Sequence, residues 1–285
     1  MISINIQNFS KSYGNTKAVQ HLSLEVNKGE LFGLIGPDGA GKTTVFRMLT
    51  TLLLPDEGSA TVEGLDIVKD YKEIRKIVGY MPGRFSLYQD LSVEENLNFF
   101  ATVFGTTIAE NYELIKDIYE QIKPFSNRRA GKLSGGMKQK LALCCALVHQ
   151  PSLLFLDEPT IGLDYSTQCS VRSFLKEYVK QNNASLILTS HNIDDIKELS
   201  DNILILNEGK QLFLGTISEL YMIVKPKKFL EFKMDDETIK QVEIQQDNQK
   251  FLETIGTIPS DRLKEINLVD MDLNEVIEEL YRRSK

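Results

Sequence analysis

Apolar residues recur along the chain in patterns that predict several kinds of element. Residues 1–9 alternate between apolar and polar side chains, which predicts a strand with one buried face. Residues 30–35 and 153–156 are short, largely apolar runs, and such runs are typical of strands covered on both faces. Strand and helix patterns alternate from residue 153 to about residue 224, as they do in a parallel α/β sheet.

A helical pattern occupies about residues 91–150, between these strand-rich regions. Ser92 and Glu95 have the spacing of a capping box ahead of the apolar residues 96–101. The longest apolar run, residues 141–148, is well short of the ~20 residues that a membrane-spanning helix needs. A role at a membrane would therefore require a partner protein.

The pattern changes again after residue 224. Residues 225–228, Lys-Pro-Lys-Lys, are a candidate linker, and residues 229–234 and 242–244 alternate like strands. Residues 272–283 predict an amphipathic helix whose apolar face carries Leu273, Val276, Ile277 and Leu280. We therefore expect one large domain over residues 1–224 and a small C-terminal α+β extension over residues 225–285.

A glycine-rich segment follows the apolar run at residues 30–35 and precedes a predicted helix. It matches G-x-x-x-x-G-K-[ST], a pattern in which glycines let backbone N–H groups surround a phosphate. A chance glycine turn would not need a strand before it and a helix after it. The candidate nucleotide-binding residues are Gly36, Pro37, Asp38, Gly39, Ala40, Gly41, Lys42, Thr43 and Thr44. Within this set, Lys42 supplies a positive charge for the phosphates and the Thr43 hydroxyl a ligand for magnesium.

Two carboxylates end the apolar run at residues 153–156. Asp157 and Glu158 cannot lie inside a strand buried on both faces, so they mark its C-terminal end, where ligands bind in open α/β sheets. Asp157 can hold magnesium and Glu158 can polarise an attacking water. An ordinary strand followed by a turn at Pro159 is the alternative. Together with the glycine-rich segment, the pair favours hydrolysis of a nucleoside triphosphate.

A second helix start with anion-binding character lies at Ser134, Gly135 and Gly136. Serine is also a favoured N-cap, so the same residues could simply begin a well-capped helix. The segment 133–137, Leu-Ser-Gly-Gly-Met, resembles the signature motif of the ATP-binding cassette (ABC) ATPases.

The resemblance to ABC ATPases covers about residues 1–220. Tyr13 matches the aromatic residue that stacks on adenine, and residues 162–164, Gly-Leu-Asp, match the loop that crosses between subunits. His191 matches the switch histidine that contacts the γ-phosphate. Lys140 differs from the arginine that is commoner at its position.

This resemblance implies a fold and a reaction. The fold is a P-loop NTPase core with a mixed or parallel sheet, an N-terminal antiparallel β segment and an inserted helical subdomain at about residues 91–150. The reaction is ATP hydrolysis with Mg²⁺ as cofactor. Lys42, Glu158 and His191 would be catalytic, and Thr43 and Asp157 would hold the metal.

The resemblance also implies partners. Two cassettes would enclose ATP between the glycine-rich segment of one and the signature of the other, so we expect a homodimer or a heterodimer with a related cassette. Residues 84–88 and 91–97 resemble ATPase subunits of bacterial exporters for drugs, antibiotics and polysaccharides. We expect a transmembrane permease partner, and a cytoplasmic chain held on the inner face of the cell membrane by that partner.

Gly83 departs from the family pattern. A glutamine normally follows the proline at this place, where it senses magnesium and water and couples the nucleotide site to the membrane partner. One interpretation is neutral change, with the backbone or another polar group taking the place of the glutamine. Another is a structural glycine that adopts a positive-φ turn. A third is a slowed or altered site, as in a regulatory cassette that binds ATP and turns it over weakly within a heterodimer.

Composition narrows the remaining classes. The net charge of −7 argues against a nonspecific nucleic-acid binder, which should be basic. Cys144, Cys145 and Cys169 are expected to be free thiols in a reducing compartment, and residues 1–9 do not resemble a signal peptide. A soluble ABC protein of translation or DNA repair is a further alternative. Such proteins usually carry tandem cassettes or long coiled-coil insertions, and the sequence has neither.

Overall fold

The computed structural model describes residues 1–225, 228–244, 252, 255–256 and 262–284. The chain forms two compact units, Met1–Thr216 and Ile217–Lys285. The division lies eight residues before the border predicted at 224/225. Helix α8 (Ile217–Val224) belongs to the second unit because it packs against the C-terminal helix of that unit.

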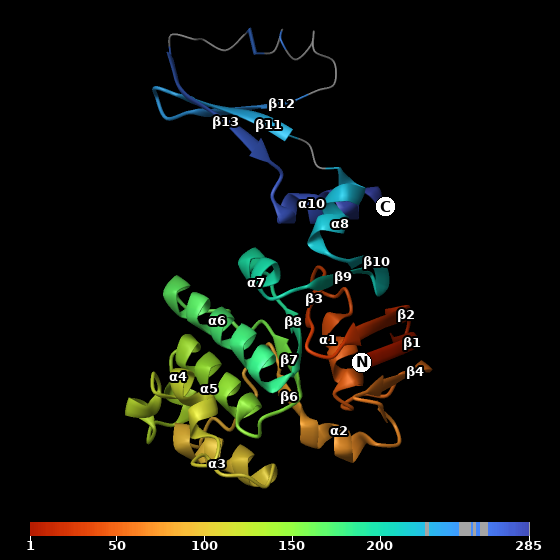
Figure 1. Cartoon of the computed structure of the whole chain (residues 1–285), viewed down its shortest axis with the longest axis vertical. Helices are drawn as coiled ribbons and strands as arrows, with labels where there is room; N and C mark the ends of the chain where they lie inside the picture. Colours follow the sequence, from red (N-terminus) through yellow and green to blue (C-terminus); the bar gives the residue numbers. More distant parts are fainter. Residues whose placement is uncertain (226–227, 245–251, 253–254, 257–261, 285) are drawn as a thin grey trace. The chain divides into compact units, whose positions relative to one another are not determined.

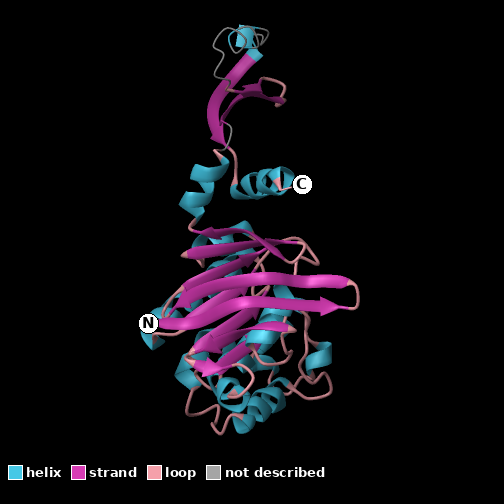
Figure 2. Ribbon diagram, turned by 90° about the vertical axis from the view of Figure 1, so that its right-hand side faces the viewer, coloured by secondary structure: helices cyan, strands magenta, loops and turns pink. Residues whose placement is uncertain are grey.

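A six-stranded sheet lies at the centre of the larger unit (Figure 2). Its order is β10-β9-β3-β8-β7-β6, with β9, β3, β8, β7 and β6 parallel and β10 antiparallel at one edge. All residues of β7 and β8 are buried, as expected for strands covered on both faces. The strands are β3 (Leu31–Ile35), β6 (Val78–Met81), β7 (Leu153–Asp157), β8 (Ser185–Thr189), β9 (Asn202–Asn207) and β10 (Lys210–Gly215).

A second, antiparallel sheet is formed by the N-terminal residues in the order β2-β1-β4-β5. The alternation of residues 1–9 is confirmed as part of β1, which pairs with β2 through a turn at Gly14, where φ is 57°. The strands are β1 (Ile2–Tyr13), β2 (Thr16–Asn27), β4 (Glu57–Val62) and β5 (Leu65–Asp66).

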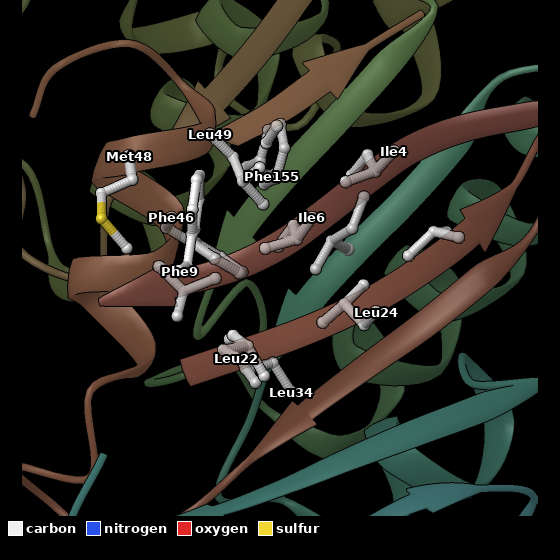
Figure 3. Close-up of a cluster of buried hydrophobic side chains, with 14 of the residues drawn as sticks. Ile4, Ile6, Phe9, Leu22, Leu24, Leu34, Phe46, Met48, Leu49 and Phe155 are labelled. Atoms are coloured by element: carbon white, nitrogen blue, oxygen red, sulfur yellow. The ribbon is translucent and has the colours of Figure 1, made fainter. Parts of the chain in front are cut away.

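The main apolar core joins the antiparallel sheet to the central sheet through α1 (Lys42–Leu49) (Figure 3). Ile6 and Phe9 of β1 are buried in this core together with Phe46 of α1. The Phe46 ring meets the Phe155 ring of β7 edge to face, with 5.4 Å between centroids. The core therefore fixes α1, and the glycine-rich segment before it, against the end of the sheet.

The segment between β6 and β7 is mainly helical (Figure 1). Its helical elements are α3 (Val93–Val103), α4 (Tyr112–Tyr119), two short 3₁₀ turns (Lys123–Phe125 and Ala130–Lys132) and α5 (Gly135–Leu147). The predicted capping box is confirmed, since Ser92 Oγ accepts from the Glu95 amide and the Glu95 carboxylate accepts from the Ser92 amide. Both α3 and α4 pack against α5.

The other helices of the larger unit are α2 (Tyr71–Ile77), α6 (Tyr165–Asn182) and α7 (Ile193–Glu198). Cys144 and Cys145 of α5 are buried free thiols, and Cys169 of α6 is a half-buried one. Burial raises the pKa of both α5 thiols. Among the helices that the structure describes, none combines the length and apolar character needed to cross a membrane.

The smaller unit contains an antiparallel sheet and two helices. Strand β11 (Lys228–Met234) lies between β12 (Ile239–Glu243) and β13 (Leu263–Asp270), and α10 (Leu273–Arg283) ends the described chain. Both predicted strands are present, the second three residues earlier than expected, and β13 has no counterpart in the sequence prediction. The C-terminal helix is confirmed, with Asp272 and Glu275 as its capping box. Pro226 and Lys227 of the predicted linker lie outside the described residues.

Candidate functional site

The glycine-rich segment forms the loop between β3 and α1. Gly39 and Gly41 have φ of 81° and 108°, and a Cβ on Gly41 would lie 2.2 Å from the Ala18 carbonyl oxygen. Helix α1 begins at Lys42 and has no acidic side chain in its first turn. Its positive end is therefore available to an anion.

Lys42 folds back over this loop. Its Nζ donates to the Gly36 carbonyl at 2.5 Å and to the Pro37 carbonyl at 3.1 Å. Burial lowers the pKa of the Lys42 ammonium, and the carboxylates of Asp38, Glu158 and Asp157 oppose that shift. The cation is therefore placed at the loop, with negative groups around it.

Asp157 ends β7 as a nearly buried carboxylate. Its Oδ1 accepts from Thr189 Oγ1 at 2.5 Å, and Thr43 Oγ1 lies 3.4 Å from its Oδ2. Carboxylate and hydroxyl oxygens are ligands that suit Mg²⁺, so the residues present fit the metal expected from the sequence. The prediction that Thr43 and Asp157 lie together agrees with this geometry.

Glu158 follows with a backbone that non-glycine residues rarely adopt, at φ of 58°. Its amide donates to the Thr189 carbonyl at 3.0 Å, and its carboxylate accepts from the His191 amide at 3.2 Å. Burial raises the pKa of the Glu158 carboxyl, and His191 opposes that rise. A raised pKa is the direction expected of a carboxylate that takes part in proton transfer.

His191 lies between the two sides of the site. Its Nε2 is 3.6 Å from Asp38 Oδ1 of the glycine-rich loop and 3.8 Å from Glu158 Oε1. The imidazole is 60% exposed, so it can meet a ligand bound at the loop. The structure thus brings together Lys42, Thr43, Asp157, Glu158 and His191, which are distant in the sequence.

Tyr13 and the signature residues lie elsewhere. Tyr13 is 46% exposed on the β1–β2 hairpin. Ser134 caps α5 by accepting from the Met137 amide at 3.3 Å, and Gly135 and Gly136 form the first turn of that helix. Within the described part of the chain, no hydrogen bond or ion pair joins these residues to the loop at 36–44.

Gly83 packs directly on Asp157. Its φ is outside the left-handed region, so the interpretation that it serves a positive-φ turn is wrong. A Cβ at this position would lie 3.2 Å from Cγ and from Oδ2 of Asp157. The Asp157 carboxylate therefore limits the space available for a side chain at position 83.

A buried polar cluster supports the site and was not predicted from the sequence. Asp195 Oδ2 accepts from Thr160 Oγ1 at 2.5 Å and from Ser190 Oγ at 2.7 Å. Its Oδ1 lies 3.0 Å from Nη1 of Arg172. The cluster ties the segment after Glu158 to the residue before His191. In the sequence, the one local indication of this cluster is Asp195 itself, an acidic residue four positions after His191.

Comparison with known proteins places this geometry in a family. Residues 19–161 match the family model described as ABC transporter. The probable multidrug ABC transporter ATP-binding protein YbhF of Escherichia coli is 42% identical over 215 residues, which cover 75% of this chain and 37% of that protein. The linearmycin resistance ATP-binding protein LnrL of Bacillus subtilis is 33% identical over 258 residues, covering 88% of this chain and 78% of that one.

A solved structure agrees with these relatives. The ATP-binding subunit of an ABC transporter superposes with a TM-score of 0.72 at 25% identity, covering 78% of this chain and 93% of that chain. The expected α/β fold, with its N-terminal antiparallel strands, is thereby confirmed. The chain belongs to the ABC transporter family, and the relatives that it matches are described as ATP-binding proteins.

Proposed function

We propose that this chain binds and hydrolyses ATP and that the hydrolysis drives export through a separate membrane subunit. The observation that carries the proposal is the convergence of Lys42, Asp157, Glu158 and His191 on the loop between β3 and α1. An α/β sheet does not need a cation, two carboxylates and an exposed imidazole at the ends of its strands in order to be stable. Their presence together therefore favours a chemical role.

Each residue has a role that fits its environment. Lys42 and the backbone N–H groups of residues 36–44 bind the β- and γ-phosphates. The Glu158 carboxylate orients and polarises the attacking water, and His191 contacts the γ-phosphate from the opposite side. Thr43 and Asp157 would hold Mg²⁺, which would neutralise phosphate charge.

The active form in this proposal is a dimer of cassettes. Ser134, Gly135 and Gly136 form a capped helix start that has no phosphate to bind within its own chain. A partner's γ-phosphate would satisfy the N–H groups of that turn, and Tyr13 would stack on adenine. The dimer is a homodimer or a heterodimer with a related cassette.

A groove beside the site suits the membrane partner. It has a volume of about 600 Å³, runs between β6 and the helices α3 and α5, and includes Met81, Phe85 and Val103 among its mostly apolar lining. Val103 is 61% exposed. We propose that an apolar segment of a transmembrane permease binds here, which would hold the chain at the inner face of the cell membrane.

Export is the proposed direction of transport. The relatives' names support it, since one is described as probably multidrug and the other as a linearmycin resistance protein. The smaller unit, Ile217–Lys285, is an extension to the proposed nucleotide-binding domain.

The Glu158→Gln variant tests the reaction. It keeps the shape of the side chain but loses the charge that polarises water, so ATP binding should persist while turnover falls at least about 100-fold. Light scattering on the same variant should show a dimer with ATP and monomer without it. Turnover close to that of the wild type would contradict the assignment of Glu158.

A second function deserves a direct comparison because of Gly83. A glycine beside Asp157 supplies no side-chain amide to the metal site, which favours a regulatory cassette with weak turnover in a heterodimer. Turnover of the purified chain, alone and with a candidate partner cassette, separates the two functions.

A further inference from the structure

Gln139 connects the signature helix to the backbone of Glu158. It is the fifth residue of α5, whose first turn carries Gly135 and Gly136. Its Nε2 donates to the Glu158 carbonyl oxygen at 2.5 Å in a partly buried position. The same carbonyl also accepts from the Ile161 amide at 3.3 Å.

This contact holds a residue in an uncommon conformation. Glu158 has φ of 58°, and a non-glycine residue stays there only when its surroundings restrain it from several sides. The amide is held by the Thr189 carbonyl and the carboxylate by the His191 amide, both at the end of β8. Gln139 restrains the remaining group, the carbonyl, and does so from the helical region between β6 and β7.

The start of α5 also packs against the loop after Glu158. A Cβ at Gly136 would lie 3.3 Å from the Gly162 carbonyl oxygen and 3.3 Å from Leu163 Cδ2. The first turns of α5 and residues 158–163 are thus in contact at two points. A shift of α5 along or around its axis must therefore move the Glu158 peptide.

We propose that Gln139 is a positioning residue that transmits the state of the signature helix to the Glu158 carboxylate of the same chain. This rests on the proposed function, in which the α5 start binds the γ-phosphate held by a partner cassette. Binding at one nucleotide site would then orient the water-polarising carboxylate at the other. Gly83 cannot supply this link because it has no side chain, whereas Gln139 already makes the contact.

Amide hydrogen exchange tests the restraint without any need for turnover. In Gln139→Ala, the peptide that contains Glu158 and Ile161 should exchange about tenfold faster than in the wild type, since the Glu158 carbonyl loses the Gln139 donor and the segment whose Ile161 amide bonds to that carbonyl opens more often. Gln121→Ala is the matched control, because Gln121 Nε2 also donates to a backbone carbonyl, that of Asp117, on the surface of the protein. Exchange at residues 158–161 that equals the wild-type rate would overturn the proposal.

Steady-state kinetics test the functional part. We expect kcat of Gln139→Ala and Gln139→Glu to fall about 10- to 100-fold, with KM for ATP and melting temperature nearly unchanged, because a small displacement of a catalytic group affects the chemical step. Gln139→Lys restores a donor and should recover turnover above that of Gln139→Ala.

The outcomes separate the two proposals. A wild-type chain without turnover in any assembly contradicts the proposed function, while the exchange result still decides on the restraint. An active wild type whose kcat survives Gln139→Ala within twofold overturns the positioning role alone. A loss of kcat that Gln139→Lys does not relieve, or that Gln121→Ala shares, also overturns it.

Discussion

Asp195→Ala should destabilise the larger unit strongly, because it removes the acceptor at the centre of a buried cluster. The Asp195 side chain is fully buried and the Arg172 side chain is 1% exposed. Breaking a buried ion pair from one side costs about 3–5 kcal/mol. Two hydroxyl donors, those of Thr160 and Ser190, lose their acceptor as well. Glu198 lies 3.0 Å from Arg172 Nε, so in the variant it still pairs with the arginine and limits the loss of stability.

The expected change is therefore about 4 kcal/mol in the free energy of unfolding. For a unit the size of Met1–Thr216, 1 kcal/mol corresponds to about 2–4 °C in Tm, so Tm should fall by roughly 10 °C. Scanning calorimetry of the full chain is the suitable assay, because it measures Tm directly.

Two further variants make the reasoning refutable. Glu198→Gln changes an exposed partner of the same arginine and should cost at most about 1 kcal/mol. Adding Arg172→Met to Asp195→Ala should recover some stability, because the unpaired buried charge is then gone. A Tm for Asp195→Ala no lower than that of Glu198→Gln would refute the argument from burial. A double variant less stable than Asp195→Ala would refute the argument from charge.

Three other outcomes follow from single positions. Gly83→Ala should lower turnover about two- to tenfold, because the new Cβ would press on Asp157. Gly83→Gln should turn over faster than Gly83→Ala, because its side-chain amide can reach the metal ligands. Equal turnover of the two variants would contradict a role for the amide. Burial lowers the pKa of His149 to about 4, so the unfolded chain binds more protons than the folded one between about pH 6.5 and 4. The unfolding free energy should therefore fall by about 2 kcal/mol from pH 7.5 to pH 5 through this group, and urea unfolding of His149→Gln should lack that part of the loss. Val103→Glu should leave turnover of the purified chain unchanged but reduce the amount of the chain recovered with a permease in membranes. Val68→Glu, at an exposed position outside the groove, should leave that recovery unchanged. Equal recovery of the two variants would argue against the groove as the docking surface.

Local patterns were enough to predict much of the fold and to single out candidate site residues that the structure brings together. The loop at residues 36–44 is specified by three closely spaced glycines, a lysine and two threonines, and the carboxylates of Asp157 and Glu158 follow an apolar run that is buried throughout. In both cases the chemistry and its structural support lie within about ten residues of each other. The resemblance then added His191 and the signature residues.

Contacts between distant residues could not be predicted in this way. Arg172 occurs within an amphipathic helix, where a charged residue ordinarily faces water, yet its partner Asp195 lies 23 positions further along the chain. Gln139 reaches a carbonyl 19 positions away, and a backbone acceptor leaves no trace in the sequence. No local pattern indicates that α8 packs against α10, and this packing puts the division between the two compact units eight residues before the predicted border.

A buried thiol of α5 allows local opening of the larger unit to be measured from its rate of chemical labelling. Cys144 is fully buried and burial disfavours its thiolate, so a maleimide or disulfide reagent can reach it only when the helix separates from its neighbours, whereas Cys145 lines the groove beside α5. Cys169, which is partly accessible, provides a fast internal reference in the same molecule. The rate at which Cys144 is labelled would therefore report how often the helical region opens, and whether nucleotide slows that opening, without any label having to be engineered into the chain.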